Sequence, residues 1–240
     1  MRAPEPPPAP HALLLDLDGT FADTFPDLID ALRAVLADAG VGVPEPEQVR
    51  HLVSVGGRRM VAAALGVELS DPAVNPLHQR FLDRYRIGIA RRTRLFPGIE
   101  QSLAAVEARG LVWGIVTNKL TWLSAPLIDA LGYAKRSACL VCGDTAAHAK
   151  PHPDPLLHAA RLLGLEPAQC AYLGDAAADV RAARAAGMRP LVAAWGYLGP
   201  RDDPSRWGAE TVLDQPADLI AWLDAANTTE QPDLRSRTAP

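Results

Sequence analysis

Short apolar runs alternate with longer amphipathic stretches along most of this chain, and this alternation constrains the fold more than any other feature. The first run, ALLLDL (12–17), is apolar until it ends in an acid, as expected of a parallel strand buried on both faces. Similar runs lie at 110–118, 138–144, 171–175 and 189–196, with a weaker one at 209–214. The stretches between them space apolar residues three or four apart, and several end in glycine, as helices commonly do. The alternation predicts an α/β protein with a doubly wound, mostly parallel sheet.

One long segment, residues 23–94, interrupts the alternation because it contains helical patterns but no convincing strand. Within it, 27–40 places several leucines and a valine on one helical face, and 60–66 and 76–92 predict further helices. The segment ends in a turn with Pro-Gly punctuation. We therefore expect an all-helical cap domain at 23–94, inserted into a Rossmann-like core domain formed by 11–22 and 95–226.

The composition of the two ends and of the whole chain narrows the class of protein. Residues 1–10 are proline-rich and lack the apolar centre of a signal peptide, and 227–240 are polar, so we expect a disordered lead-in and tail. The net charge of −4, with no basic stripe, argues against a nucleic-acid partner. No tract approaches the length of a membrane span. We expect a cytoplasmic protein, monomeric or homodimeric.

Three cysteines and six histidines offer little sign of metal or redox chemistry. The single CxxC (CLVC, 139–142) lies in an apolar run, where cysteine is a common buried hydrophobic residue, so we interpret its thiols as structural. The histidines show no metal-ligand spacing, although His148 and His152 flank Lys150.

Polar residues follow the ends of successive predicted strands. In an open parallel sheet, ligands bind at the carboxyl ends of the strands, so these side chains are expected to share a site. Each alone is a common turn or cap residue, but their joint placement indicates function. The residues are Asp16, Asp18, Thr117, Asn118, Lys150, Asp175 and Asp179.

Four short stretches carry a resemblance to a known family. DLDGT (16–20), TNK (117–119), Lys150 in AKPHPDP (149–155) and GDAAAD (174–179) resemble the four motifs of the haloacid dehalogenase superfamily of aspartate-nucleophile phosphatases. The longer stretches DGTFADTFPDL, WGIVTNK, KPHPDPLLHAA and GDAAADVRAARAAGM resemble its phosphoglycolate phosphatase group. The inserted helices resemble that group's mobile cap. The resemblance extends over nearly all of residues 12–226.

The first motif suits attack on a phosphate monoester. Because such an ester is a dianion, a metal and cationic groups must neutralise charge on the transferring oxygens. Mg²⁺ is the expected cofactor, since it prefers carboxylates combined with substrate phosphate. Asp16 can offer one oxygen to the metal and the other to phosphorus, becoming an aspartyl-phosphate. The resemblance implies that Asp18 binds the metal through its backbone carbonyl, which leaves its side chain to protonate the leaving alcohol and later activate water.

The other motifs supply charge and hydrogen bonds. Thr117 is expected to donate its hydroxyl to a phosphoryl oxygen with help from the Asn118 amide, and Lys150 to offset charge on phosphate and on Asp16. Asp175 is expected to complete the metal site. Asp179, one helical turn later, is expected to bind the metal through water or to contact another ligand.

Two glycine-containing stretches are expected to bind substrate. Gly19 permits close approach of the backbone to phosphate, and Thr20 is grouped with it. In the cap, SVGGRRM (54–60) places Arg58 and Arg59 at the start of a helix, where one of them can bind the non-phosphate end of a substrate.

The expected activity is Mg²⁺-dependent hydrolysis of a small phosphorylated metabolite, with 2-phosphoglycolate as the leading substrate. One alternative is an N-acetylmuramic acid 6-phosphate phosphatase of cell-wall recycling, because the cap and not the first motif selects the substrate. Another is a β-phosphoglucomutase-like phosphotransferase of carbohydrate metabolism. A dehalogenase is disfavoured because that branch lacks the second acid, Asp18. A non-catalytic binding protein is disfavoured because all four motifs are intact.

Overall fold

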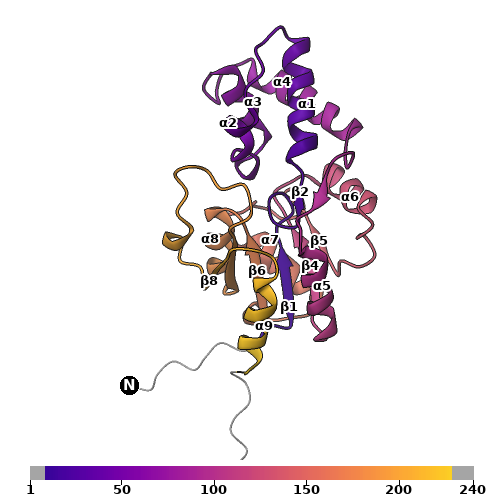
Figure 1. The fold of residues 1–240 in the computed structure, drawn as a ribbon, viewed down its shortest axis with the longest axis vertical. Coiled ribbons are helices and arrows are strands. Elements are labelled where there is room, and N and C mark those ends of the chain that lie inside the picture. Colours follow the sequence, from indigo (N-terminus) through magenta and orange to yellow (C-terminus); the bar gives the residue numbers. More distant parts are fainter. Residues whose placement is uncertain (1–8, 229–240) are drawn as a thin grey trace, which may run out of the picture.

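The computed structural model describes residues 9–228, which form a parallel sheet covered by helices and a group of helices beyond one end of it (Figure 1). The sheet has six strands in the order β5-β4-β1-β6-β7-β8, and every pairing within it is parallel. Its strands are β1 (Ala12–Leu15), β4 (Val112–Val116), β5 (Leu140–Val141), β6 (Cys170–Gly174), β7 (Arg189–Ala193) and β8 (Thr211–Leu213). The predicted α/β fold with a mostly parallel sheet is confirmed.

Helices cover both faces of the sheet because neighbouring residues of each strand point in opposite directions. On β1, Leu13 and Leu15 belong to a core that includes α5, α6 and α9, whereas Ala12 and Leu14 belong to a second core with α7 and α8. This explains the uninterrupted apolar run of the first strand. The helices are α5 (Ile99–Ala108), α6 (Thr121–Ala130), α7 (Asp154–Leu163), α8 (Ala177–Ala186) and α9 (Asp218–Thr228).

The segment between β1 and α5 forms a separate helical group near the carboxyl ends of the strands (Figure 1). Helix α1 packs against α4, and α3 packs against α4, burying Leu32, Phe81 and Tyr85 among other apolar side chains. The helices are α1 (Phe25–Asp38), α2 (Pro46–Arg50), α3 (Gly57–Leu65) and α4 (Val74–Ile87), with a 3₁₀ turn at Val53–Val55.

The chain enters and leaves this helical group through a short antiparallel pair, β2 (Ala22–Asp23) and β3 (Arg94–Leu95). The buried carboxylate of Asp27 accepts hydrogen bonds from the backbone N–H groups of Arg92 and Thr93, at 2.9 Å each, and so ties α1 to the returning strand. We propose that this pair is the hinge between a core domain and a cap domain at 23–94.

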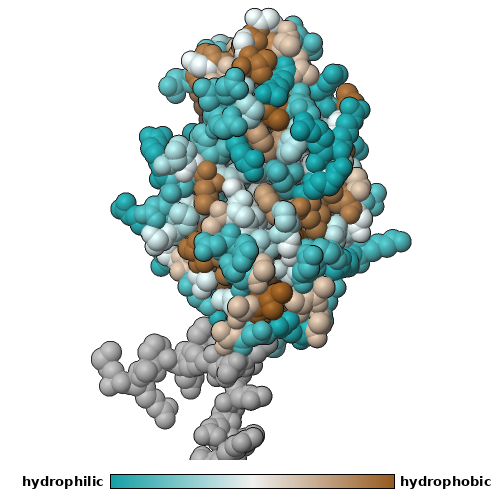
Figure 2. Space-filling view, viewed as in Figure 1, coloured by the Kyte–Doolittle hydropathy of each residue, from teal (hydrophilic) through white to brown (hydrophobic). Residues whose placement is uncertain are grey.

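The two ends of the described chain differ from the expected disordered lead-in and tail. Most of the predicted lead-in and tail lies outside the described residues. Where it is described, the prediction is wrong: Ala9 and Pro10 are buried, and Asn227 and Thr228 belong to the end of α9. Over residues 9–228, no helix is long and apolar enough to cross a membrane. Hydrophilic residues cover most of the surface seen in Figure 2, with apolar ones interspersed.

The three cysteines are free and buried, and burial raises the pKa of Cys139 and of Cys170 to about 11, as expected of structural thiols.

Candidate active site

The predicted site residues converge where three neighbouring strands end. Asp16 follows β1, Thr117 follows β4 and Asp175 follows β6, and β1 lies between the other two strands in the sheet. Lys150 comes from the loop before α7, and Asp179 lies in the first turn of α8. All five side chains are buried. The expected convergence at the carboxyl edge of the sheet therefore holds for five residues from four separate stretches of the chain.

Lys150 is the central cation of this cluster. Its Nζ atom lies 2.9 Å from Asp16 Oδ1 and 2.7 Å from Asp179 Oδ1, and it also contacts the Tyr172 hydroxyl at 2.6 Å. Burial by itself would lower the pKa of Lys150, but the charges of the two carboxylates hold it above its ordinary value. The ammonium therefore stays charged and sets the position of Asp16.

The acids outnumber this cation. One carboxylate oxygen from each of Asp16, Asp175 and Asp179 lies within 4.8 Å of the others. Burial first, and then the charges of Asp16 and Asp179, raise the pKa of Asp175 well above its ordinary value. Burial likewise raises the pKa of Asp16 to about 6, with Lys150 opposing the rise and Asp179 adding to it. Three acids facing one ammonium make a site that favours a further positive charge.

The hydrogen bonds of Asp175 test whether a metal fits here. Its Oδ2 atom accepts from the backbone N–H of Tyr197 at 2.8 Å and from the hydroxyl of Ser54, a cap residue, at 2.9 Å. Its Oδ1 atom is buried and has no hydrogen-bond partner among the described residues. An unpartnered carboxylate oxygen costs free energy in a protein interior unless a cation binds it. The all-oxygen donor set is the one that Mg²⁺ prefers, so the residues fit the expected cofactor.

Gly19 is required here for a reason that the sequence did not indicate. Its φ of +89° belongs to the left-handed region, and a Cβ at this position would lie 2.1 Å from Asp175 Oδ2. The residue thus allows Asp175 to approach the loop after β1. Neither Gly19 nor Thr20, both predicted to bind substrate, lines the cavity described below, and the Thr20 side chain is fully buried.

Asp18 pairs with a lysine to which sequence reasoning gave no role. Lys119 Nζ lies 3.0 Å and 3.2 Å from the two carboxylate oxygens of Asp18, which also accepts a hydrogen bond from the Thr24 hydroxyl. The same ammonium lies 4.5 Å from the centre of the Tyr85 ring, which belongs to the cap. The only available signal was that Lys119 completes the TNK stretch. The contacts hold the Asp18 carboxylate at the boundary between core and cap.

Thr117 and Asn118 are adjacent in sequence, but their side chains have different hydrogen-bond partners. The Thr117 hydroxyl accepts a hydrogen bond from the Lys119 N–H at 3.2 Å and still has its own proton to donate. The Asn118 amide was expected to help bind phosphate. Instead it uses both ends on the main chain of Lys150, donating from Nδ2 to the carbonyl and accepting at Oδ1 from the N–H, at 2.9 Å each. Asn118 therefore positions the loop that carries Lys150.

A cavity of about 400 Å³ opens above these groups, between core and cap. Its cap wall includes Tyr85, whose buried hydroxyl has no hydrogen-bond partner among the described residues. Arg58 and Arg59 also line it from the start of α3, and both are exposed, with Arg58 donating to the Leu69 carbonyl at 3.3 Å. Its floor is formed by Asp16, Asp18, Thr117, Asn118, Lys119, Lys150 and Asp179. The two arginines are thus brought to the same cavity as the predicted catalytic groups.

Comparison with known proteins agrees with this arrangement. The family model "Haloacid dehalogenase-like hydrolase" matches residues 13–193. The N-acetylmuramic acid 6-phosphate phosphatase of Pseudomonas aeruginosa is 44% identical over 215 residues, which cover 90% of this chain and 95% of that protein. The phosphoglycolate phosphatase of Xylella fastidiosa is 44% identical over 207 residues, which cover 86% and 90%. The crystal structure of a predicted phosphoglycolate phosphatase from Haemophilus somnus has a TM-score of 0.80 at 24% identity, covering 89% of this chain and 98% of that one, and shows the same fold.

Proposed function

The chain belongs to the haloacid dehalogenase-like hydrolase family, and from that premise we propose that it is a Mg²⁺-dependent phosphatase acting on a small phosphate monoester. The observation that most supports this proposal is the buried cluster of Asp16, Asp175 and Asp179 around the Lys150 ammonium. A phosphoryl group bound at the floor of the cavity would meet a nucleophile, a fixed cation and the Thr117 hydroxyl together.

We assign the first chemical step to Asp16. Its carboxylate attacks phosphorus, so that a carboxylate oxygen–phosphorus bond forms while the bond from phosphorus to the alcohol oxygen breaks. Asp18 gives its proton to that departing oxygen. In the second step Asp18 takes a proton from water as the water oxygen attacks phosphorus, which releases phosphate and regenerates Asp16. Lys150 stabilises the negative charge on the phosphoryl oxygens throughout.

The pair Lys119–Asp18 fits this division of labour. Lys119 and Thr24 fix the orientation of the Asp18 carboxylate at the cavity floor, while the Asp16 carboxylate is held by Lys150. The two acids therefore have separate partners, although they are only two residues apart. Separate partners allow one acid to serve as nucleophile and the other to move protons.

Mg²⁺, when bound, would offset charge on the substrate phosphate and on the attacking carboxylate. We propose that Asp16, Asp175 and Asp179 hold it, the last directly or through water. The unpartnered Oδ1 atom of Asp175 supports this set.

Mg²⁺ should therefore raise the melting temperature of the metal-free protein. At a concentration of about 100 times its Kd, binding stabilises by about 2.7 kcal/mol, which corresponds to a rise of roughly 5–10 °C for a chain of this size. Differential scanning calorimetry with and without Mg²⁺ measures the rise. Asp175→Asn should reduce it to below about 2 °C, since an uncharged amide is a poorer ligand for a hard cation. The exposed Asp129→Asn serves as the matched control, and an equal rise in all three proteins would exclude the acidic cluster as the metal site.

The cavity bears on the choice of substrate. Its volume of about 400 Å³ lies in the range of pockets that enclose whole drug-sized molecules. The two-carbon body of phosphoglycolate would leave much of that space to water. A phosphorylated sugar with a carboxylate substituent would occupy more of it and could present the carboxylate to Arg58 or Arg59. We therefore propose N-acetylmuramic acid 6-phosphate as the preferred substrate, in place of the phosphoglycolate expected from sequence. Phosphoglycolate is the second candidate, because it also carries a carboxylate and relatives at 43–44% identity are named for it.

Steady-state kinetics on three compounds test the choice. We expect kcat/KM for N-acetylmuramic acid 6-phosphate to exceed that for phosphoglycolate by about 100-fold or more, because each additional buried group contributes on the order of tenfold. N-Acetylglucosamine 6-phosphate, which has a hydroxyl in place of the lactyl ether and its carboxylate, should fall between them. In the double variant Arg58→Ala/Arg59→Ala, the preference for the lactyl compound over N-acetylglucosamine 6-phosphate should disappear. A preference for phosphoglycolate, or a double variant with unchanged ratios, would contradict the substrate proposal without affecting the proposed chemistry.

A further inference from the structure

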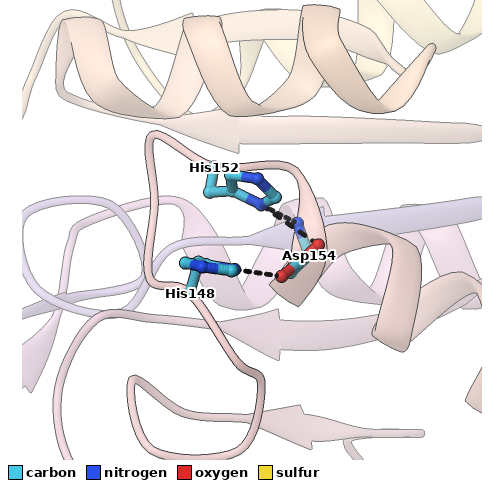
Figure 3. Close-up of side chains that lie close together, drawn as sticks. All are labelled: His148, His152 and Asp154. Carbon is cyan, nitrogen blue, oxygen red and sulfur yellow. Dashed lines mark hydrogen bonds and ion pairs between the residues drawn. The ribbon is translucent and has the colours of Figure 1, made fainter.

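A second group of metal-binding side chains lies outside the active-site cluster, on the loop before α7 (Figure 3). His148 and His152 project from this loop toward Asp154, the first residue of the helix. His148 Nδ1 lies 2.8 Å from Asp154 Oδ2, and His152 Nδ1 lies 3.0 Å from Asp154 Oδ1. The two imidazole rings have centroids 4.5 Å apart and are inclined by 35°. Both rings therefore direct the same nitrogen to one carboxylate.

The contacts of His152 Nδ1 indicate what can lie between this nitrogen and Asp154. The backbone N–H of Asp154 approaches His152 Nδ1 at 3.4 Å, a long distance for a hydrogen bond. The same nitrogen lies 3.0 Å from a carboxylate oxygen of Asp154, which offers only lone pairs. A cation therefore lies between these two atoms, either a proton on Nδ1 that is donated to the carboxylate or a metal ion that both atoms bind. A metal ion between them would provide that cation without requiring a proton on Nδ1.

We propose that His148, His152 and Asp154 bind one divalent transition-metal ion of the Zn²⁺, Co²⁺ or Ni²⁺ class. The three ligand atoms lie within 4.8 Å of one another, and ions of this class bind imidazole nitrogen and carboxylate oxygen at about 2.0–2.2 Å. Two nitrogen donors distinguish this group from the all-oxygen cluster suited to Mg²⁺. The side chains of His148 and His152 are 65% and 48% exposed, so a metal ion can reach them and water can complete its coordination.

The sequence showed no metal-ligand pattern among the histidines, and it is the structure that brings these three side chains together. On a helix, the spacing His-x₃-His-x-Asp would place only some of the three side chains on one face. Here the turn between Lys150 and Pro153 brings all three together. The proposed ligands also flank the segment that carries Lys150. Since the two histidines lie two residues before and two residues after Lys150, a bound ion would link both ends of the segment that carries this lysine.

Isothermal titration calorimetry with Zn²⁺ tests the proposal on the full chain, with excess Mg²⁺ present to occupy the acidic cluster. We expect one equivalent of Zn²⁺ to bind. Either His148→Ala or His152→Ala should weaken binding by about tenfold or more, and the double variant should lose it. His11→Ala, which removes an exposed histidine at the amino end of β1, should bind like the unsubstituted protein.

Co²⁺ gives an independent reading because its visible absorption reports nitrogen and oxygen ligands directly. Bands that appear with the unsubstituted protein and are absent from His148→Ala/His152→Ala, at unchanged far-ultraviolet circular dichroism, would support the site. His148→Gln and Asp154→Asn, which keep the side-chain volume, should weaken the same bands. No Zn²⁺ binding in the presence of Mg²⁺, or equal binding by the double variant, would overturn the proposal.

Discussion

Asp16→Asn is expected to lower kcat by at least about 10³-fold, because the amide cannot attack phosphorus and the covalent intermediate cannot form. The fold should persist. The substitution removes one partner of Lys150, but Asp179 remains 2.7 Å from the ammonium, and repulsion among the buried acids is relieved. We therefore expect the melting temperature in the absence of metal to change by only a few degrees, on the order of 1 kcal/mol.

The measurement is phosphate release under saturating substrate and Mg²⁺, with circular dichroism to verify folding. Asp129→Asn, the same chemical change at an exposed position in α6, should keep full activity. Rapid-quench experiments with ³²P-labelled substrate should detect phosphorylated protein in the unsubstituted chain and none in Asp16→Asn. Turnover near that of the unsubstituted protein would show that another residue is the nucleophile.

Lys150→Met is expected to affect both stability and activity. The ammonium is buried between Asp16 and Asp179, and removing it leaves two acids without their cation. Breaking a buried ion pair on one side costs about 3–5 kcal/mol, which for a chain of this length lowers the melting temperature by roughly 6–20 °C. The value of kcat should fall by about 10²-fold or more, because charge on the phosphoryl group is no longer offset.

The loss of stability should depend on pH in a direction that identifies its cause. In the intact protein Asp16 has a pKa raised to about 6, and Lys150 opposes that rise, so its removal moves the folded-state pKa higher still. A carboxyl group whose pKa is raised in the folded state destabilises that state increasingly as pH rises from its unfolded value to its folded value. The deficit of Lys150→Met should therefore be small below pH 6 and grow above it.

Urea unfolding of the metal-free proteins between pH 5 and 8 measures this deficit. Adding Asp179→Asn to Lys150→Met should recover part of the stability at high pH, because one uncompensated acid is removed, but should not recover activity. Lys135→Met, at an exposed position, should leave both unchanged. A deficit that does not vary with pH would indicate lost packing of the lysine chain and not lost charge compensation.

Much of the fold could be predicted from local patterns, because strand and helix periods are properties of short windows. The run at 12–17 and the helical stretch at 27–40 correspond to β1 and to α1, within two or three residues. Prediction was poorer where pairing with a strand distant in sequence decides whether a segment becomes a strand. The run at 138–144 is a strand only at Leu140–Val141, and Asp23 and Arg94 pair in β2 and β3 although neither lies in a strand-like pattern.

The membership of the candidate site was also largely predictable, since a parallel sheet brings the ends of its strands to one edge whatever their order in sequence. The partners of those residues were not. Ser54 donates to Asp175 from 121 residues away, and Tyr85 reaches Lys119 from the cap. Such contacts depend on how two groups of helices and strands pack, which no local pattern encodes.

The sequence by itself determined the parallel α/β core, the inserted helices and the acids and lysine that gather at the strand ends. Only the tertiary structure decided the use of each group: Asn118 supports the Lys150 loop, Gly19 makes room for Asp175, and the arginines of α3 face a cavity large enough for a sugar phosphate. The physical reason is the range of the interactions. Periodicity arises between residues a few positions apart, whereas burial and charge pairing depend on segments that meet only after folding.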